Sequence, residues 1–437
     1  MSQPLSPADT LFLAILEDLP PELLELACQF KAFERARKVR SPLQLLRLVL
    51  LFAGLDLTLK QTAATFTLLQ NESISDTAVR NRLLACIPWV RAILLELLPK
   101  QSFQTLRNGA RLLVTDSSTA QGPAAKSTDW RIHLTIDLFR LQFVHVDVTD
   151  FRGAESLERV PLLPGDIVLA DRGYCRQRSL MHVQDCNADS VVRFNTGTLI
   201  LEREHGEHID LVAKLKTYRY KKKTYFPVFL TGHQRQGGVA GWIHAERASP
   251  GLRAERQRVM RQTKKRKGFT PTKDGLYLCG WLLVFTTLSP EEWTTDELLK
   301  LYRARWQVEL VFKRLKSLLD LDEVRAKRES KTGELWLLGK LLYAALLEKG
   351  FRARTDKALF LLLESRSMTP WKLYVLEAIR IQPVISGAAF WHPEAWEKAL
   401  IVLADRRRKR RLQALPNQVG QYLKQTLPGQ SPCETGC

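Results

Sequence analysis

Apolar residues recur every three or four positions at both ends of the chain. In the first 105 residues this spacing is clearest in three segments: 18–30, 41–55 and 88–98. In the C-terminal part it returns in four segments: 334–351, 358–366, 370–380 and 395–415. A repeat of three to four residues places apolar side chains on one face of a helix. We therefore expect helical regions at both ends.

Residues 59–85 contain two short amphipathic segments around a polar turn. Ser75 or Asp76 stands where the second segment needs an N-cap. The pattern resembles a helix-turn-helix, with Arg80 and Arg82 on the later helix. A helical hairpin that serves only packing fits the same pattern, so both interpretations stay open.

The period changes at residue 111, where short runs rich in Val, Ile and Leu begin. They predict strands within five segments: 111–116, 130–138, 143–150, 166–174 and 190–195. Gly and Pro signals separate several of these runs, and a short helix is predicted at 176–186. Together they indicate a mixed α/β unit in the middle of the chain.

The next part, residues 196–278, keeps a strand-like pattern but becomes strongly basic. Its candidate strands are 198–204, 208–215, 224–232 and 237–246. Segment 252–273 holds nine Lys and Arg residues against one Glu. We interpret it either as a solvated loop or, beside a nucleic-acid site, as a run that contacts phosphates. A buried-strand pattern returns at 276–288.

A helix with two different stripes is predicted over residues 302–316. Four polar residues fall on one side of its helical wheel: Tyr302, Arg305, Glu309 and Lys316. Lys313 borders them, and an apolar stripe beside them would pack on a core. The pair Arg305 and Glu309, four positions apart, also fits an ordinary solvated helix face.

Two aspartates follow apolar strand patterns directly. Asp116 ends the run 111–116, and Asp171 ends the apolar part of 166–174. A carboxylate in this position points into the crevice at the carboxyl edge of a sheet, although a single one often only forms an Asx-turn. With Glu309 they make three hard oxygen ligands, which suit Mg²⁺ or Mn²⁺. Two such ions can activate an attacking oxygen and stabilise a leaving one.

Charge changes the expected partner. The 437 residues carry 66 Lys and Arg against 46 Asp and Glu, a formal net charge of +20. This excess favours a polyanion, nucleic acid first and an acidic membrane surface second. A basic protein without such a partner is the remaining alternative.

Cysteine usage and hydropathy indicate the compartment. The seven cysteines form no CxxC pair, which argues against a disulfide framework and against a zinc site. The N-terminus lacks the basic region of a signal peptide. The longest apolar run, 45–59, is interrupted by Arg47 and Asp56 and falls short of the roughly 20 clean residues that a membrane span needs. We expect a soluble cytoplasmic protein with no membrane partner.

Three motifs carry a resemblance to a known family. VTDSST around Asp116, LADRGY around Asp171, and the Y-x2-R-x3-E-x6-K spacing from Tyr302 to Lys316 resemble the bacterial DDE transposases of insertion sequence family four. This is the group with the Tyr-Arg-Glu-Lys signature, and the resemblance covers roughly residues 105–350. It implies an α/β fold: an RNase H-like mixed-sheet catalytic core with a β-rich insertion, flanked by N- and C-terminal helical regions.

The resemblance implies five parts. Residues 1–105 would be an N-terminal helical DNA-binding region, and 106–195 the first part of the core. Residues 196–278 would be the β-rich basic insertion, and 279–350 the second part of the core with the catalytic Glu helix. Residues 351–437 would be a C-terminal helical region for dimerisation or DNA contact. Within it we interpret the basic run from Arg406 to Arg411 as a solvated tail and the final residues as disordered.

The same resemblance implies roles for single residues. Asp116, Asp171 and Glu309 would be catalytic and would bind two metal ions, Mg²⁺ or Mn²⁺. The side chains expected on DNA are Tyr302, Arg305, Lys313, Lys316 and Arg172. Arg172, like Tyr174, could instead brace Asp171. Trp281 either stacks on a flipped base or is a buried strand residue. His133 is interpreted only as a strand residue near the site.

The expected function is cut-and-paste transposition of an insertion sequence. The protein would bind terminal inverted repeats, nick each 3′ end, form a hairpin and transfer the strand to target DNA. Because two ends must be held together, we expect a homodimer on double-stranded DNA, associated with the bacterial nucleoid. One alternative is an RNase H-like DNA nuclease without strand joining. Another is a DNA-binding protein that is not an enzyme, in which the three carboxylates are coincidental.

Overall fold

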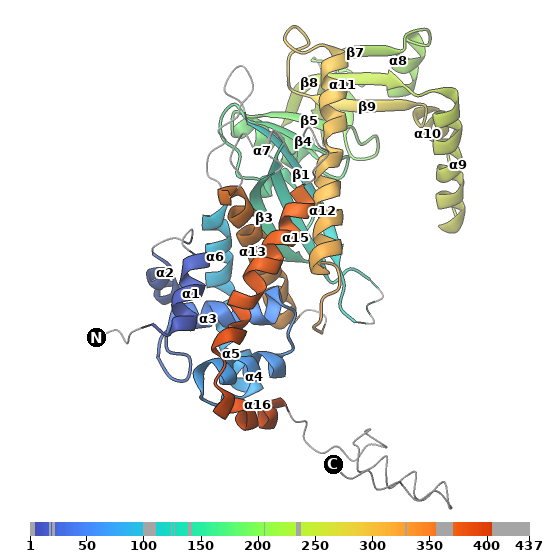
Figure 1. Ribbon diagram of the computed structural model, residues 1–437. Coiled ribbons are helices and arrows are strands. Elements are labelled where there is room, and N and C mark those ends of the chain that lie inside the picture. Colours follow the sequence, from blue (N-terminus) through green and yellow to red (C-terminus); the bar gives the residue numbers. More distant parts are fainter. Residues whose placement is uncertain are drawn as a thin grey trace, which may run out of the picture.

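One twisted sheet runs through the molecule, and helices gather at one end of it (Figure 1). The computed structural model describes residues 5–403 apart from 17–18, 20–21, 99–110, 124, 126, 139–141, 205, 233–236, 328–329 and 355–369. The predicted helix at 358–366, the basic run Arg406 to Arg411 and the C-terminal tail lie outside the described residues.

The N-terminal part is helical, as predicted. Its elements are α1 (Pro7–Ile15), α2 (Leu23–Gln29), α3 (Pro42–Val49), a π-helical turn (Leu50–Gly54), α4 (Leu59–Gln70), α5 (Asp76–Ala85) and α6 (Ile87–Leu97). The Ser75 side chain accepts the Ala78 backbone N–H and so caps α5, one of the two predicted caps. Asn71, in the left-handed conformation, ends α4.

The first five strands form the core half of the sheet. They are β1 (Leu112–Ala120), β2 (Trp130–Asp137), β3 (Gln142–Asp150), β4 (Ile167–Ala170) and β5 (Asp189–Arg193). The strands β1, β4 and β5 run parallel, and β2 and β3 add antiparallel on the β1 side. Helix α7 (Gln177–Asp185) connects β4 to β5. This arrangement confirms an α/β fold consistent with the predicted RNase H-like core.

The last four strands form the insertion half. They are β6 (Ile200–Glu202), β7 (Lys223–Thr231), β8 (Gly238–Arg247) and β9 (Trp281–Thr286). All four pair antiparallel, and β9 also pairs antiparallel with β5. The order β3-β2-β1-β4-β5-β9-β8-β7-β6 therefore makes one continuous nine-stranded sheet.

Three predicted segments of this half differ in the structure. Segment 208–215 was expected as a strand, but Asp210 accepts two backbone N–H groups and begins helix α8 (Leu211–Thr217). A solvated loop was one of two interpretations of the basic segment, but most of it is helix α9 (Pro250–Arg266), capped by Ser249. Residues 276–278 belong to helix α10 (Lys273–Leu278), so the returning strand starts only at Trp281. At 208–215 and 276–278 a capping side chain, Asp210 or Thr272, outweighs a short apolar run, whereas in the basic segment Ser249 caps a helix of exposed residues.

The predicted helix over residues 302–316 consists of two helices that meet at Arg305. These are α11 (Thr295–Ala304) and α12 (Trp306–Leu319). The Arg305 N–H bonds to the Tyr302 carbonyl and the Val308 N–H to the Arg305 carbonyl, three residues apart in each case. Such bonds tighten the turn and interrupt the regular α-helix. The two axes still follow one another closely (Figure 1).

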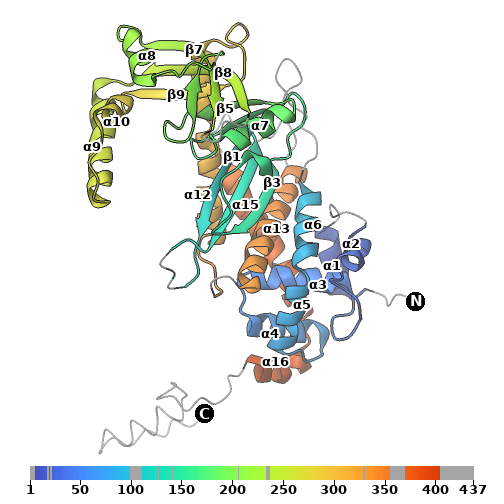
Figure 2. The same ribbon diagram turned by 180° about the vertical axis from the view of Figure 1, so that it is seen from behind.

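The C-terminal part is also helical. Helix α13 (Lys331–Arg354) is buried along most of its length and packs against α6 and the π-helical turn. Helix α15 (Pro370–Ser386) packs on α13, and α16 (Trp396–Leu403) returns to α4. Both views show α16 beside α4, so the two ends of the described chain form one helical body (Figures 1 and 2).

Side chains on β1 and β4 alternate between two cores. Leu112 and Val114 face the core shared with the helical body, whereas Leu113 faces the core that continues into the insertion half. This alternation follows from the two-residue period of a strand. The sheet is therefore covered by α12 and α13 on one face and by α7 on the other.

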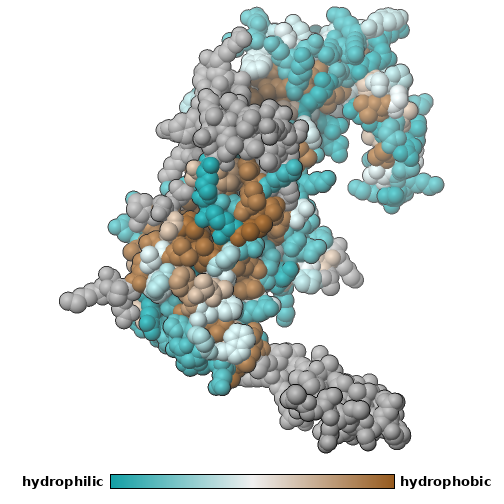
Figure 3. Space-filling model, in the orientation of Figure 1, coloured by the Kyte–Doolittle hydropathy of each residue, from teal (hydrophilic) through white to brown (hydrophobic). Residues whose placement is uncertain are grey.

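Within the described residues, one helical segment, Lys372–Phe390, is long and apolar enough by length and composition to cross a membrane. A single such segment is weak evidence for a membrane span, because core helices of soluble proteins have the same length and composition. Ile381 and Ile385 are buried in the helical body, while Leu376 and Ile379 are exposed. Figure 3 shows apolar areas on the surface of the molecule.

Candidate active site

The register of two parallel strands brings the two aspartates together. Val114 on β1 pairs with Leu169 on β4. Two residues further along each strand, the same register puts Asp116 level with Asp171. Asp171 follows the end of β4, as predicted, but Asp116 lies within β1, which continues to Ala120. The prediction that Asp116 ends its strand is wrong, because β2 keeps pairing with β1 beyond it.

Arg305 links this sheet edge to α12. Its guanidinium lies 3.2 Å from Asp116 Oδ2 and also contacts the Glu309 carboxylate. Asp116 and Arg305 are largely buried, whereas the Glu309 side chain is 54% exposed. The turn at Arg305 thus places one cation against a carboxylate from the sheet and another from the helix.

The electrostatics of Asp116 reflect this crowding. Burial raises the pKa of Asp116 to about 6, and the negative charges of Asp171 and Glu309 add to the rise. The Ser117 backbone N–H and the Arg305 guanidinium oppose it. An ionised Asp116 is therefore held by few favourable contacts, and added positive charge at this place would stabilise it.

An open cavity of about 480 Å³ adjoins these groups. Its polar lining includes Asp116, Glu309, Lys313, Lys316 and Asp322. Lys316 Nζ lies 3.6 Å from Asp322 Oδ2. Two lysines thus face the same cavity as two of the predicted metal-binding carboxylates, an arrangement that suits an anionic phosphate next to a cation.

Three other predicted residues have different surroundings. Tyr302 is 7% exposed and packs in the core, although its ring centroid lies 6.0 Å from the Arg305 guanidinium carbon. Trp281 begins β9, is 5% exposed and has the Arg247 guanidinium 5.9 Å from its ring centroid. Arg172 is exposed immediately after Asp171. The structure thus places Arg305 in contact with both Asp116 and Glu309, and buries Tyr302 and Trp281.

The donor set fits a hard divalent cation. In the part of the chain that the structure describes, no three His, Cys, Asp or Glu side chains lie close enough together to hold a metal ion. The fit rests on chemistry: Asp116 is destabilised by its carboxylate neighbours, and a guanidinium already contacts both Asp116 and Glu309. Carboxylate oxygens are the ligands that Mg²⁺ and Mn²⁺ prefer.

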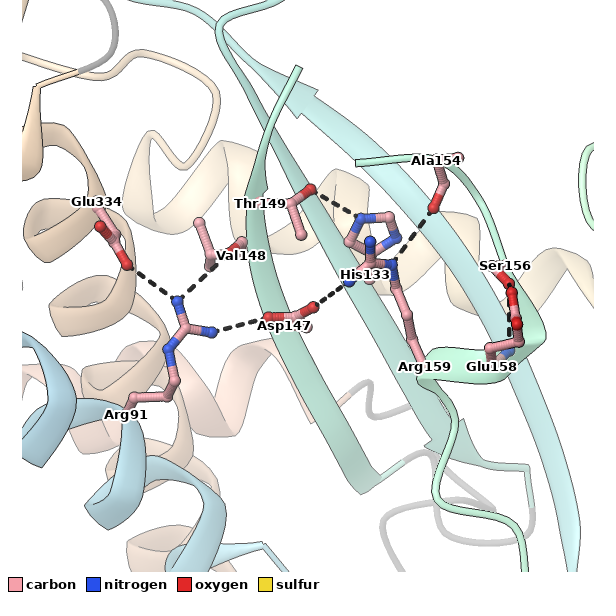
Figure 4. A network of polar contacts seen from close by, with 10 residues as sticks. All are labelled: Arg91, His133, Asp147, Val148, Thr149, Ala154, Ser156, Glu158, Arg159 and Glu334. Atoms are coloured by element: carbon pink, nitrogen blue, oxygen red, sulfur yellow. Dashed lines mark hydrogen bonds and ion pairs between the residues drawn. The ribbon is translucent and has the colours of Figure 1, made fainter. Parts of the chain in front are cut away.

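A polar network joins β2 and β3 to neighbouring helices (Figure 4). Arg91 from α6 bonds Asp147 at 2.8 Å and Glu334 of α13 at 3.0 Å, and Arg159 bonds the other Asp147 oxygen at 2.9 Å. Burial alone would raise the pKa of Asp147, but the two arginines lower it below its ordinary value. His133, interpreted as a strand residue, is buried, and its Nε2 lies 3.1 Å from Thr149 Oγ1. The network fastens both helical regions to the sheet.

The sequence patterns missed one carboxylate beside the site. Glu155 follows β3 and accepts a hydrogen bond from Ser117 Oγ at 2.8 Å. Its other partner is Arg131, 3.4 Å away. No strand precedes Glu155 directly and no motif contains it, so only its place in the fold identifies it.

Helix α9 presents a different kind of charge. None of its residues is buried, and in both ribbon views it stands apart from the body of the molecule (Figures 1 and 2). Its basic residues are Arg253, Arg256, Arg258, Arg261, Lys264, Lys265 and Arg266. The only acidic residue of α9, Glu255, is bonded to Arg258. We call α9 with Lys267 the basic arm.

A basic hollow lies beside α5 in the helical body. It has a volume of about 500 Å³. The cations that line it are Lys31, Arg35, Arg37, Lys38 and Arg82, against one acid, Glu34. Arg82, on the later helix of the predicted helix-turn-helix, donates to the Arg35 carbonyl at 2.9 Å.

Comparison with known proteins adds a family to this geometry. The profile of the family described as "Transposase DDE domain" matches residues 107–345. Over 339 residues the chain is 30% identical to the putative transposase InsL for insertion sequence element IS186A of Escherichia coli (strain K12), which covers 75% of this chain and 90% of that protein. The transposase for insertion sequence element IS421 of Escherichia coli is 30% identical over 340 residues, with the same two shares. The transposase for insertion sequence element IS231F of Bacillus thuringiensis subsp. israelensis is 25% identical over 244 residues, 51% of this chain and 50% of that protein.

Proposed function

This chain belongs to the transposase DDE domain family, and on that premise we propose that it moves an insertion sequence by a cut-and-paste route. The family implies enzymatic cleavage of DNA, strand transfer and the use of a divalent metal. The observation that carries the proposal for this chain is the strand register that makes Asp116 level with Asp171, with Arg305 and Glu309 in contact beside them.

We assign Asp116, Asp171 and Glu309 as the catalytic ligands of two ions, Mg²⁺ or Mn²⁺. When bound, the metal supplies activation of the attacking oxygen and stabilisation of the leaving one. The residues of the chain supply three negative charges in a partly buried place. The raised pKa of Asp116 supports this assignment, because burial and neighbouring carboxylates favour a bound cation there.

Phosphate binding near the cut is assigned to Arg305, Lys313 and Lys316. The two lysines line the cavity next to Asp116, and Arg305 lies against it. Tyr302 packs beside Arg305 and would orient it rather than reach DNA through an open surface. Tyr302, Arg305 and Lys316, together with Glu309, make the Tyr-Arg-Glu-Lys signature of insertion sequence family four, to which we assign the chain.

The proposed order of steps is nicking at the 3′ end, hairpin formation and strand transfer to target DNA. Hairpin formation requires a base to leave the stack, and Trp281 is the proposed stacking partner. The tryptophan lies beyond the edge where Asp171 sits: Val284 pairs with Arg193, β9 runs antiparallel to β5, and Trp281 begins β9 three residues before Val284. Its burial means that it would have to turn out of the core to act.

The remaining DNA contacts are assigned to two basic surfaces. One is the hollow beside α5, in the proposed N-terminal DNA-binding region, and the other is the basic arm. The exposed Arg172, next to Asp171, is assigned to DNA near the cut. Because the two ends of an element must be held together, we propose a homodimer on DNA. The exposed Leu376 and Ile379 of α15 offer apolar area for contact in the C-terminal region. We also propose that the protein acts in the cytoplasm, in association with the nucleoid, because its substrate is DNA.

The test uses purified full-length protein with DNA duplexes from both ends of the element that encodes it. Uncut and pre-cut ends are incubated with Mg²⁺ and target DNA, and nicked, hairpin and joined products are resolved. We expect nicks on uncut ends and joined products from pre-cut ends. Nicks without any joined product would favour the nuclease, and binding without a cut would contradict both enzymes. Inverted repeats and a short target duplication around the gene are an independent check.

A further inference from the structure

Glu155 lies between the two segments that carry the catalytic aspartates. Its Oε1 accepts the hydrogen bond from Ser117 Oγ at 2.8 Å. Its Oε2 lies directly against Gly173, where an added Cβ would overlap with it. One side chain therefore contacts the residue after Asp116 and the second residue after Asp171.

The two residues that Glu155 contacts also hold the aspartates. The Ser117 backbone N–H donates to Asp116 Oδ1 at 2.8 Å. In the same way, the Gly173 backbone N–H donates to Asp171 Oδ1 at 2.7 Å. Two short chains of contact thus run from a single carboxylate to both aspartates, one along β1 and one along the turn after β4.

An ion pair with Arg131 holds the Glu155 side chain in its orientation. Arg131, on the neighbouring strand β2, lies 3.4 Å from the same oxygen that accepts from Ser117. Both side chains are partly buried, with exposed fractions of 24% for Arg131 and 27% for Glu155. An ion pair that is partly shielded from water holds its geometry better than an exposed pair. Oε2 is thereby kept against Gly173.

We propose that Glu155 is a positioning residue for the proposed reaction. It holds Ser117 and Gly173, and through their N–H groups it sets the direction of the Asp116 and Asp171 carboxylates. The inference rests on the catalytic role proposed for these aspartates. Residues that orient the ligands of a metal ion typically change metal affinity or activity by about 10- to 100-fold when they are replaced.

The test compares Glu155→Ala and Glu155→Gln with the unchanged full-length protein. One readout is the single-turnover nicking rate on end duplexes in Mg²⁺, and the other is the Mn²⁺ concentration that gives half of the thermal stabilisation without DNA. For Glu155→Ala we expect a loss of about 10- to 100-fold in rate and a comparable rise in the Mn²⁺ concentration, with end-DNA affinity within about twofold. Glu155→Gln should recover part of both, because its amide oxygen can still accept from Ser117 Oγ.

A second variant keeps the Glu155 carboxylate but displaces it from its position. Gly173→Ala places a methyl group where Glu155 Oε2 lies and 3.0 Å from Asp171 Oδ1, so its defect should be at least as large as that of Glu155→Ala. If Glu155→Ala does not fold, Gly173→Ala carries the test. The matched control is Glu158→Ala, which removes an exposed carboxylate three residues away that contacts Ser156 and Arg178 instead.

Three outcomes separate the possibilities. Defects in Glu155→Ala and Gly173→Ala with a normal Glu158→Ala support the proposal. Normal Mn²⁺ stabilisation and nicking in both variants overturn it. A Glu155→Ala protein that loses Mn²⁺ stabilisation as completely as Asp116→Asn also overturns it, because Glu155 would then be a ligand. The Mn²⁺ readout needs no cleavage, so an unchanged protein that binds Mn²⁺ but never nicks DNA contradicts the proposed function and leaves this inference testable.

Discussion

In the core half of the sheet, charged groups are partly buried and each has a specific partner. Asp116 faces Arg305, Glu155 faces Arg131 and Ser117, and these contacts join several elements. In the insertion half, the most strongly charged element is the basic arm, none of whose helical residues is buried. Both halves belong to one continuous sheet, so the same backbone supports two different uses of charge.

The difference predicts two kinds of sensitivity. A charge in a partly buried site interacts strongly over short distances, so the loss of one group or a small displacement matters. Exposed cations on a helix contact phosphates through charge alone, so their effects add up and are weakened by salt. Single substitutions should therefore be decisive in the core half and nearly additive on the basic arm.

The largest effect is expected from the three carboxylates that we propose as catalytic. Asp116→Asn, Asp171→Asn and Glu309→Gln keep size and remove charge, and each should lower the single-turnover cleavage rate by roughly 10³-fold, the scale reached when a charge-stabilising group is removed from an enzyme. End binding should survive, as a gel-shift assay would show. Full cleavage by any of the three variants would remove that residue from the site.

The second prediction asks whether the halves are equally well buried despite their different charges. His133 on β2 and His244 on β8 are both buried, and burial lowers the pKa of each to about 4. Between the ordinary value and about 4, the unfolded chain binds a proton that the folded chain does not. Stability is therefore complete above the ordinary pKa and is lost as pH falls through this range, by about 3 kcal/mol per histidine.

His133→Gln and His244→Gln test this loss one half at a time. Urea unfolding is followed between pH 7 and pH 4, and the free energy of unfolding of each variant should fall less steeply than that of the unchanged protein. Because the pKa of each histidine is lowered to about 4, the two variants should flatten the curve by similar amounts. Parallel curves for a variant and the unchanged protein would show that its histidine is not protonated on unfolding.

Arg305 and Lys316 should give an intermediate effect. Each offers a charge-assisted hydrogen bond to phosphate, so Arg305→Ala or Lys316→Ala should weaken assembly on pre-cut ends by about 10- to 100-fold. Mn²⁺-dependent thermal stabilisation should change less than assembly, since neither side chain is a metal ligand. Unchanged strand transfer would count against their role, and Arg303→Ala, a neighbouring cation that pairs with Glu246, is the control.

The smallest effect per residue is expected on the basic arm. The substituted residues, all changed to Gln, are Arg261, Lys265, Arg266 and Lys267. The fourfold variant should bind DNA about tenfold more weakly at moderate salt, and the slope of log affinity against log salt should fall by about three to four. Binding is measured by fluorescence anisotropy at several salt concentrations.

The control for the arm removes the same number of exposed cations from other elements. The control positions are Arg152, Arg178, Arg203 and Lys300. An equal loss in this control would mean that the arm acts only through net charge. A fourfold arm variant with an unchanged salt slope would show that the arm does not contact phosphates.

Much of the local structure could be predicted from residue patterns. The helical ends, the core strands and the Ser75 cap follow from apolar periodicity and capping chemistry, and the structure confirms them. Two errors lie where a capping side chain competes with an apolar run, at Asp210 and Thr272. A further error is the prediction of a single helix through Arg305. A helical wheel assumes regular α-helical geometry, so it does not detect a tightened turn.

The amino-acid sequence by itself determined which residues could do chemistry: two aspartates in apolar runs, the Tyr302 to Lys316 spacing, and an excess of positive charge. Only the tertiary structure decided that Asp116 is level with Asp171, that Arg305 contacts Asp116, and that Glu155 lies between the aspartate segments. The physical reason is that periodicity reports how one segment is buried. The pairing of distant segments depends on strand register, which no single segment contains.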